Sequence, residues 1–181
     1  MGIKAFALLT LAALLAVLLN FGQPFWCACG YFNLWASDIK SSHTSQHFFD
    51  AYSFSHLQHG FIFYFILYRF FKLPLNLGYL FAAGILLESG WEVLENTSII
   101  IDRYRSQTIA FNYYGDSIAN SFGDVLSCFI GLFTASRLSW QFSLFLCILV
   151  ELTMLLIIKD CLGLNILMLI YPSNAVRRWQ E

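Results

Sequence analysis

The stretch AFALLTLAALLAVLLNF, from Ala5 to Phe21, is apolar almost throughout and carries no charged residue. A helix of roughly 20 mostly apolar residues spans the hydrocarbon core of a bilayer. Four further stretches are predominantly apolar, at 54–71, 75–94, 118–135 and 142–158, and a shorter piece at 164–171 is too short to span. The sequence therefore predicts an all-α, polytopic transmembrane helical bundle of about five spans. A short C-terminal re-entrant or interfacial helix completes this single integral membrane domain, residues 1–181.

The composition of the whole chain also indicates a membrane protein. Hydrophobic residues make up 59% of the 181 residues and charged residues only 12%. Soluble domains carry about 25% charged and about 45–50% apolar residues. The formal net charge of −1 leaves no basic face for a phosphate backbone, so we expect membrane lipids and no nucleic acid as partners.

The first apolar stretch has the layout of a secretory signal, because Lys4 precedes an apolar core. No small-x-small cleavage site follows Asn20, so we expect a retained membrane anchor. With the N-terminus inside, the cytoplasmic segments carry four Lys and Arg residues and the opposite segments six, which alone favours the reverse orientation. The tight turns at 69–74 and 137–140 are more typical of cytoplasmic loops, and on that ground we expect the N-terminus inside.

Ionisable residues are concentrated at one end of the predicted helices. His56 and His59 are three residues apart at the start of the second span, which places both imidazoles on one helix face. The third span ends with Glu88, Glu92 and Glu95, whose spacing of four and then three puts them on one stripe. Such residues are expensive inside hydrocarbon and need partners or water.

A third polar stripe begins the fourth span. It consists of Asp116, Asn120 and Asp124, at i, i+4 and i+8. Because successive spans run antiparallel, this helix start, the start of the second span and the end of the third lie at the same membrane face. The loop that carries Arg103 and Arg105 lies there as well. We therefore predict a functional site at one bilayer boundary.

The acidic stripes require positive compensation, and a divalent metal such as zinc is one way to supply it. The predicted metal ligands are His56, His59, Glu88, Glu92 and Asp124. The predicted catalytic residues are His59, Glu92, Asp116, Arg103 and Arg105. Two alternatives stay open: a buried protonated glutamate that acts as an acid, and an ion-pair network with the arginines and Lys159.

Three classes of function fit this pattern. The first is a membrane-embedded enzyme that acts on a lipid or lipid-linked envelope substrate at the extracytoplasmic face, with Arg103 and Arg105 holding an anionic head group. The second is a small ion or solute carrier. Glu151 is the only charge deep within a span, so a polar path to the other face is missing. The third is a non-enzymatic assembly or stability factor in which the cluster is structural.

Several polar and small residues have plain structural interpretations. Asp116 is placed to cap the N-terminus of the fourth span. Gly123, Ser127 and Gly131 recur every four residues, which is typical of a close-packing helix face. Trp91 lies among the glutamates and is expected to wall the site.

Cys27 and Cys29 form a C-x-C pair in the first loop. A disulfide between residues two apart is strained. Metal binding, pairing with a partner and a reduced state are the alternatives for this pair.

Four motifs together resemble an uncharacterised family of bacterial multi-pass inner-membrane proteins, catalogued as a domain of unknown function. They are SHLQHG (55–60), ESGWEVLENTSIIIDRYR (88–105), YYGDSIANSFGD (113–124) and LNILMLIYP (164–172). The resemblance implies a location in the bacterial cell inner membrane and this helix layout, and it implies no activity. The order of histidine, acidic residue, arginine and Asp…Asn…Gly is also similar to VanZ-like membrane proteins, which would suggest an envelope-related role. The second histidine and the extra glutamate depart from that pattern.

Overall fold

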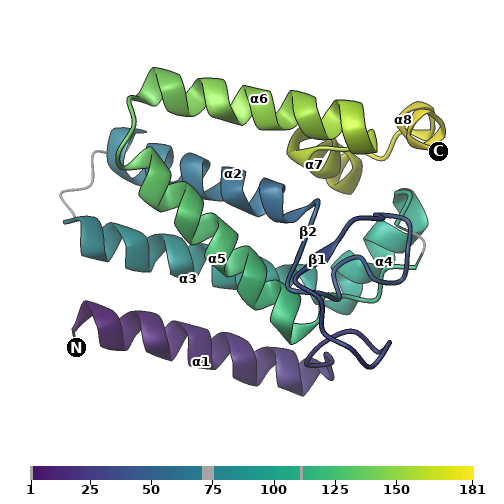
Figure 1. The fold of residues 1–181 in the computed structure, drawn as a ribbon, viewed down its shortest axis with the longest axis horizontal. Coiled ribbons are helices and arrows are strands. Elements are labelled where there is room, and N and C mark those ends of the chain that lie inside the picture. The colour runs from purple at the N-terminus through teal and green to yellow at the C-terminus, as the bar shows by residue number, and fades with distance from the viewer. Residues whose placement is uncertain (1, 71–75, 111) are drawn as a thin grey trace.

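The computed structural model describes residues 2–70, 76–110 and 112–181, which are mostly helical (Figure 1). Five elements form the long part of the molecule: α1 (Ile3–Phe21), α2 (Ser53–Tyr64), α3 (Leu77–Glu95), α5 (Ile118–Ala135) and α6 (Trp140–Ile158). Shorter helices follow between and after them: α4 (Ser98–Gln107), α7 (Leu162–Ile170) and α8 (Asn174–Gln180). Two parallel two-residue strands, β1 (Trp35–Ala36) and β2 (Phe49–Asp50), pair within the first loop.

Four helices are long and apolar enough to cross a membrane, namely α1, α3, α5 and α6. The expected second span, 54–71, corresponds to α2 followed by the π-helical turn η1 (Phe65–Phe70). At a rise of 1.5 Å per residue, the 12 residues of α2 cover about 18 Å, which is less than the thickness of the hydrocarbon core. Residues 71 and 75, where the second and third spans were expected to end and begin, lie outside the described residues. The prediction of five spans is therefore not confirmed.

The end of the chain and the segment before α5 are more helical than expected. Helix α7 agrees with the short helix predicted at 164–171, but α8 was not predicted. Helix α4 occupies a polar segment that we expected to be a loop. Most of its residues are polar or charged, and Tyr104 is its one buried residue. The segment therefore lacks the apolar stripe from which a helix is predicted.

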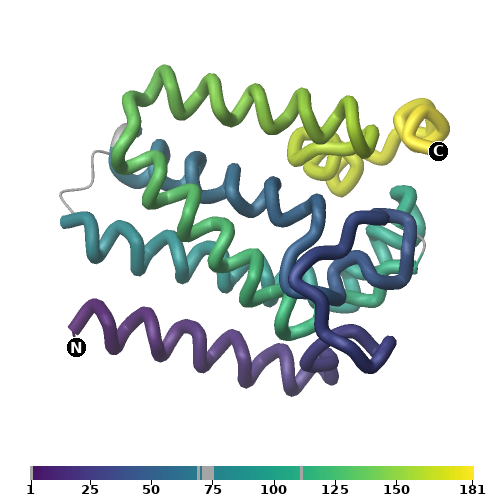
Figure 2. Tube along the Cα trace, in the orientation of Figure 1, coloured from purple at the N-terminus to yellow at the C-terminus, as the bar shows by residue number. Residues whose placement is uncertain are grey.

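The long helices α1, α2, α3 and α6 lie roughly side by side, α5 crosses them obliquely, and successive long helices run in opposite directions (Figures 1 and 2). The small elements gather at one end. Helix α1 ends, α2 begins, α3 ends and α5 begins at that end, where the strands, α4, α7 and α8 also lie. This polar end is the arrangement that the antiparallel reasoning requires.

Helices α2 and α5 approach each other through glycines. A Cβ atom added to Gly131 would overlap the backbone oxygen of Leu57, and one added to Gly60 would overlap that of Cys128. A Cβ atom on Gly123 would overlap the oxygen of Phe48, in the first loop. The close-packing face predicted from Gly123, Ser127 and Gly131 is therefore confirmed.

The outer helices expose apolar side chains, as expected of surfaces that meet lipid. Helix α6 buries only Met154, and exposes large residues such as Leu156 and Ile157. Helix α1 buries one narrow stripe, Thr10, Leu14 and Leu18. The polar residues of the predicted stripes are, in contrast, buried in the interior.

Candidate functional site

Two successive turns of α2 direct His56 and His59 toward α3. His56 Nδ1 lies 2.6 Å from Glu88 Oε1, and His59 Nδ1 lies 3.1 Å from Glu88 Oε2. His56 and Glu88 are buried, and His59 is partly covered by Phe63 and Trp91, whose rings lie 5.7 Å from the imidazole. The spacing of three residues, read from the sequence, thus brings both imidazoles to one carboxylate.

Glu92, one turn further along α3, is fully buried beside the same imidazole. Its Oε1 atom lies 3.3 Å from His56 Nδ1, without the geometry of a hydrogen bond. Neither carboxylate oxygen of Glu92 has a hydrogen-bond partner among the described residues. A buried charge without such partners is costly, and buried charges in proteins are normally paired or bound to metal.

Asp124 faces the other nitrogen of His56. Its Oδ2 atom lies 3.7 Å from His56 Nε2, and its Oδ1 atom accepts a hydrogen bond of 2.7 Å from Ser53 Oγ. Because Glu88 and Glu92 are on the Nδ1 side, Asp124 does not join the same donor group. Asp124 is not part of the donor groups of described residues that could hold an ion, and its predicted role as a metal ligand stays a prediction.

Two groups of three donors could hold a metal ion here. The donor atoms of His56, His59 and Glu88 lie within 4.8 Å of one another, and so do those of His56, Glu92 and Glu95. Both groups use His56. A ligating imidazole commonly places its second nitrogen against a carboxylate, which is the position that Asp124 occupies.

Asp116 is anchored outside the spans, just before α5. Its carboxylate accepts hydrogen bonds from Asn96 Nδ2 at 3.0 Å and from the Tyr113 hydroxyl at 3.1 Å. Burial raises the pKa of Asp116 to about 6, and His56 partly offsets this. Ser117, and not Asp116 as expected, is the N-cap of α5, because its side chain accepts from the Asn120 amide.

A cavity of about 230 Å³ opens onto these residues from the polar end. Its polar lining includes His56, His59, Glu95, Asp116 and Asp124, and Trp91 lines it as expected. Glu88 and Glu92 are not part of the lining, because they lie behind the imidazoles. Apolar residues complete the lining, among them Ile109, Leu162, Ile166 and Leu169.

The two arginines lie away from this cavity. Arg103 donates hydrogen bonds to the backbone oxygens of Leu169 at 3.0 Å and Ile170 at 3.4 Å, at the end of α7. Arg105 lies over the Tyr114 ring at 4.5 Å. Neither lines the cavity, and among the described residues no ion pair joins them or Lys159 to the buried carboxylates. The helical conformation of α4 explains this, since it turns Tyr104 inward and the arginines outward.

Three cavity residues were not singled out from the sequence as site residues. Tyr52 donates a hydrogen bond of 3.1 Å to Asp160, and both line the cavity with Lys40. Lys40 comes from the middle of the first loop, and only the folding of that loop over the bundle brings it there. Asp160 is two residues beyond the predicted end of the last span, and this position was the one signal that the sequence offered for it.

Comparison with known proteins places the chain among uncharacterised bacterial relatives. A family model described as a protein of unknown function (DUF2585) matches residues 18–181. A UPF0314 protein of Sphingopyxis alaskensis is 46% identical over 171 residues, covering 94% of this chain and 90% of the relative. A UPF0314 protein of Paracoccus denitrificans is 42% identical over 175 residues, covering 97% and 89%. No solved structure matches, and the likeness to VanZ-like proteins finds no support.

Proposed function

The chain belongs to the DUF2585 family of unknown function, and on that premise we propose that it is a membrane-embedded, metal-dependent enzyme. Its substrate would be a lipid or a lipid-linked envelope compound, reached at the extracytoplasmic face of the bacterial inner membrane. The observation that carries the proposal is the buried His56 and the partly covered His59, which both contact Glu88 at the base of a cavity. The metal would be held by His56, His59 and Glu88, whose donor atoms lie within 4.8 Å of one another.

The charge balance of the cluster supports a bound cation. Glu88, Glu92 and Asp124 are almost completely buried and surround His56. Three ionised carboxylates would exceed the positive charge by one even with both histidines protonated. A divalent cation held by His56, His59 and Glu88 would offset this charge beside Glu92, whose oxygens have no hydrogen-bond partner among the described residues.

The residues around the cluster provide what a hydrolytic or transfer reaction needs. A bound divalent metal supplies Lewis-acid polarisation of an ester or phosphoryl oxygen. Asp124 faces His56 Nε2 and orients the imidazole, and Ser53 holds Asp124 in turn. Glu95 and Asp116 line the cavity and are the carboxyl groups placed to take up or deliver a proton.

The cavity wall supports an amphipathic substrate. Leu162, Ile166 and Leu169 form one apolar face of α7, at i, i+4 and i+7, beside the polar base. Lys40 is the one lysine or arginine among the described lining residues. We therefore assign the recognition of an anionic head group to Lys40 in place of Arg103 and Arg105.

The test combines metal analysis with a lipid assay on the full chain, purified in detergent. We expect bound metal in the wild type, and we expect H59A and E88A to lose the cluster's metal while E151Q, a carboxylate of α6 outside the cluster, retains it. Vesicles of phosphatidylethanolamine, phosphatidylglycerol and cardiolipin, with added polyprenyl diphosphate, would be analysed for products by mass spectrometry. We expect a product whose formation H59A abolishes.

The other two classes of function predict different results. Ion flux into proteoliposomes that E92Q abolishes, without a lipid product, would replace the enzyme with a carrier. Metal content that is identical in wild type, H59A and E88A, together with a large loss of stability, would make the cluster structural.

A further inference from the structure

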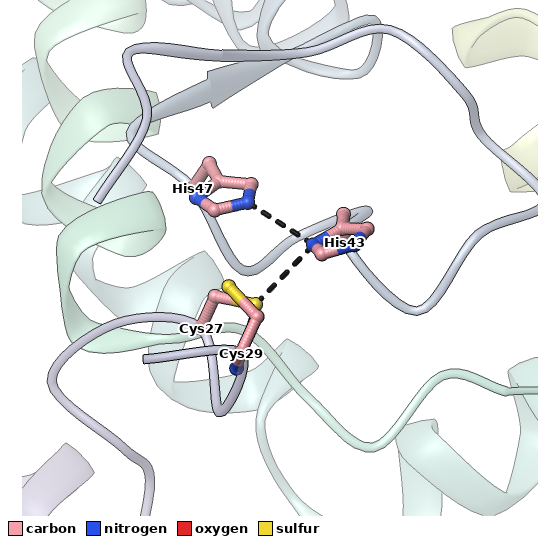
Figure 3. A group of neighbouring side chains, drawn as sticks. All are labelled: Cys27, Cys29, His43 and His47. Atoms are coloured by element: carbon pink, nitrogen blue, oxygen red, sulfur yellow. Dashed lines mark hydrogen bonds between the residues drawn. The ribbon is translucent and has the colours of Figure 1, made fainter. Parts of the chain in front are cut away.

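A second group of metal-ligating side chains lies in the first loop, outside the cavity. Cys27 and Cys29 follow α1, and His43 and His47 lie in the turns before β2. One donor atom from each lies within 4.8 Å of every other (Figure 3). We propose that these four residues bind one Zn²⁺ ion as a structural centre. The inference does not depend on the proposed function, because it uses none of the cluster residues.

The donor distances match those of a tetrahedral zinc site. Zinc lies about 2.3 Å from sulfur and about 2.0–2.1 Å from imidazole nitrogen, so tetrahedral geometry separates two nitrogens by about 3.3 Å and a sulfur from a nitrogen by about 3.5 Å. The His43 Nδ1 and His47 Nε2 atoms are 3.2 Å apart. The Cys27 Sγ and His43 Nδ1 atoms are 3.4 Å apart, and the dashed lines in Figure 3 mark the contacts of His43 with Cys27 and with His47.

The spacing in the sequence agrees with this geometry. The ligands follow the order C-x-C, then 13 residues, then H-x3-H. Zinc sites with two cysteines and two histidines have three to five residues between the histidines, as here, whereas the single residue between Cys27 and Cys29 is one fewer than the usual minimum of about two. Reasoning from the sequence considered the cysteine pair without His43 and His47, although the spacing could have indicated all four ligands.

The surroundings are those of a closed site. Both thiols are free, and the Cys29 amide donates a hydrogen bond of 3.2 Å to Cys27 Sγ. Cys27 and His47 are buried, and the Tyr31 ring stacks on His47 with centroids 5.8 Å apart. Four protein ligands leave no open position, which is typical of structural rather than catalytic zinc.

One hydrogen bond must change when the metal binds. The Asn33 amide donates to His47 Nδ1 at 3.2 Å, so the His47 proton lies on Nε2. Ligation through Nε2 moves this proton to Nδ1 and releases the Asn33 amide. One neutral hydrogen bond is lost while four metal–ligand bonds form, so the exchange favours binding.

The site is placed to fix the loop on α5. Three backbone amides at the N-terminal end of α5 donate hydrogen bonds to carbonyl oxygens of the loop. They pair Ser117 with Ser45, Ile118 with Pro24 and Ala119 with Phe25. These acceptors lie within three residues of a proposed ligand. Residues 39–41, 44 and 45 of the same loop line the cavity. Zinc would therefore hold both the cap of α5 and one wall of the cavity in place.

The experiment measures zinc and then uses cobalt as a spectroscopic probe. The full chain is purified in detergent under reducing conditions, stripped with a chelator and titrated with Zn²⁺ or Co²⁺. We expect a thiolate-to-cobalt charge-transfer band in the wild type and in E88A. We expect C29S to weaken the band, because Cys27 is then the one thiolate ligand, and to bind Zn²⁺ roughly 100-fold or more weakly, because a direct ligand is worth more than an outer partner. Cys29 is exposed, so this variant leaves the packing intact, and C147S is the matched control.

Two results would overturn the inference. One is protein purified in parallel without reductant that contains no zinc and in which Cys27 and Cys29 form a disulfide, seen as the loss of two hydrogens in the intact mass. The other is a cobalt spectrum without a thiolate band at saturating Co²⁺. Loss of metal in E88A with retention of the thiolate band would leave this site in place and concern only the cavity, so the two proposals fail separately.

Discussion

Replacing Gly131 with alanine tests the close contact between α2 and α5 directly. The added methyl group would overlap the Leu57 oxygen and lie 3.1 Å from Gly60 Cα, closer than the roughly 3.5–4.0 Å of normal carbon contacts. Both neighbours are backbone atoms, so the helices must separate. Overpacking of this kind costs about 1–3 kcal/mol. For a chain of this size, that corresponds to a fall in melting temperature of about 2–12 °C.

Thermal unfolding in detergent, followed by circular dichroism, measures this effect. Gly90 provides the control, because it lies in α3 with no atom within 4 Å of an added Cβ. G90A should be neutral or stabilising, since alanine favours a helix over glycine by about 1 kcal/mol. The separation in G131A also moves His56 away from Asp124, so metal binding at the cluster should weaken. A melting temperature of G131A at or above that of G90A would refute the packing argument.

Three further predictions concern single side chains. Burial raises the pKa of Asp160 to about 6 from an ordinary value of 3.8, so the folded protein binds this proton more tightly and its stability falls as pH rises from about 4 to 6. D160N should therefore become more stable than the wild type across that range, by about 3 kcal/mol at pH 7. A difference in stability that does not depend on pH would contradict this. E92Q should raise the melting temperature of the chelator-treated protein, because it removes a buried carboxylate without hydrogen-bond partners among the described residues. It should also reduce the rise in melting temperature that added metal gives the wild type, and equal responses to metal would argue against the site. R103A should lower the free energy of unfolding by about 1 kcal/mol, because its hydrogen bonds to the end of α7 are lost, and should leave the metal content unchanged. Loss of activity at unchanged stability would instead indicate that Arg103 acts in the site.

The sequence predicted the four long apolar helices from their runs of apolar residues, and it predicted which polar side chains share a helix face from the helical repeat. Glu88 and Glu92 share a stripe in any helix, and antiparallel crossing brings that stripe opposite His56 and His59. The first loop could not be predicted in this way. Its contacts join residues far apart in the chain, such as Pro24 with Ile118, and no local pattern encodes them. The same holds for Lys40 at the cavity.

The arginines show the limit of reasoning from loops. Their segment was expected to be irregular and free to fold over the site. In the structure it is helix α4, whose Tyr104 is buried while Arg103 and Arg105 face outward. A position in a loop fixes only the membrane face at which a side chain lies, whereas a position in a helix also fixes the direction in which that side chain points.

The contacts of the first loop with α5 set an order for biogenesis. The loop carbonyls of Pro24, Phe25 and Ser45 find their donors only at residues 117–119. When the loop has crossed or reached the membrane boundary during synthesis, the helix that supplies those donors has not yet left the ribosome. The loop can therefore form these contacts only after α5 has been synthesised, well after its own residues have left the ribosome.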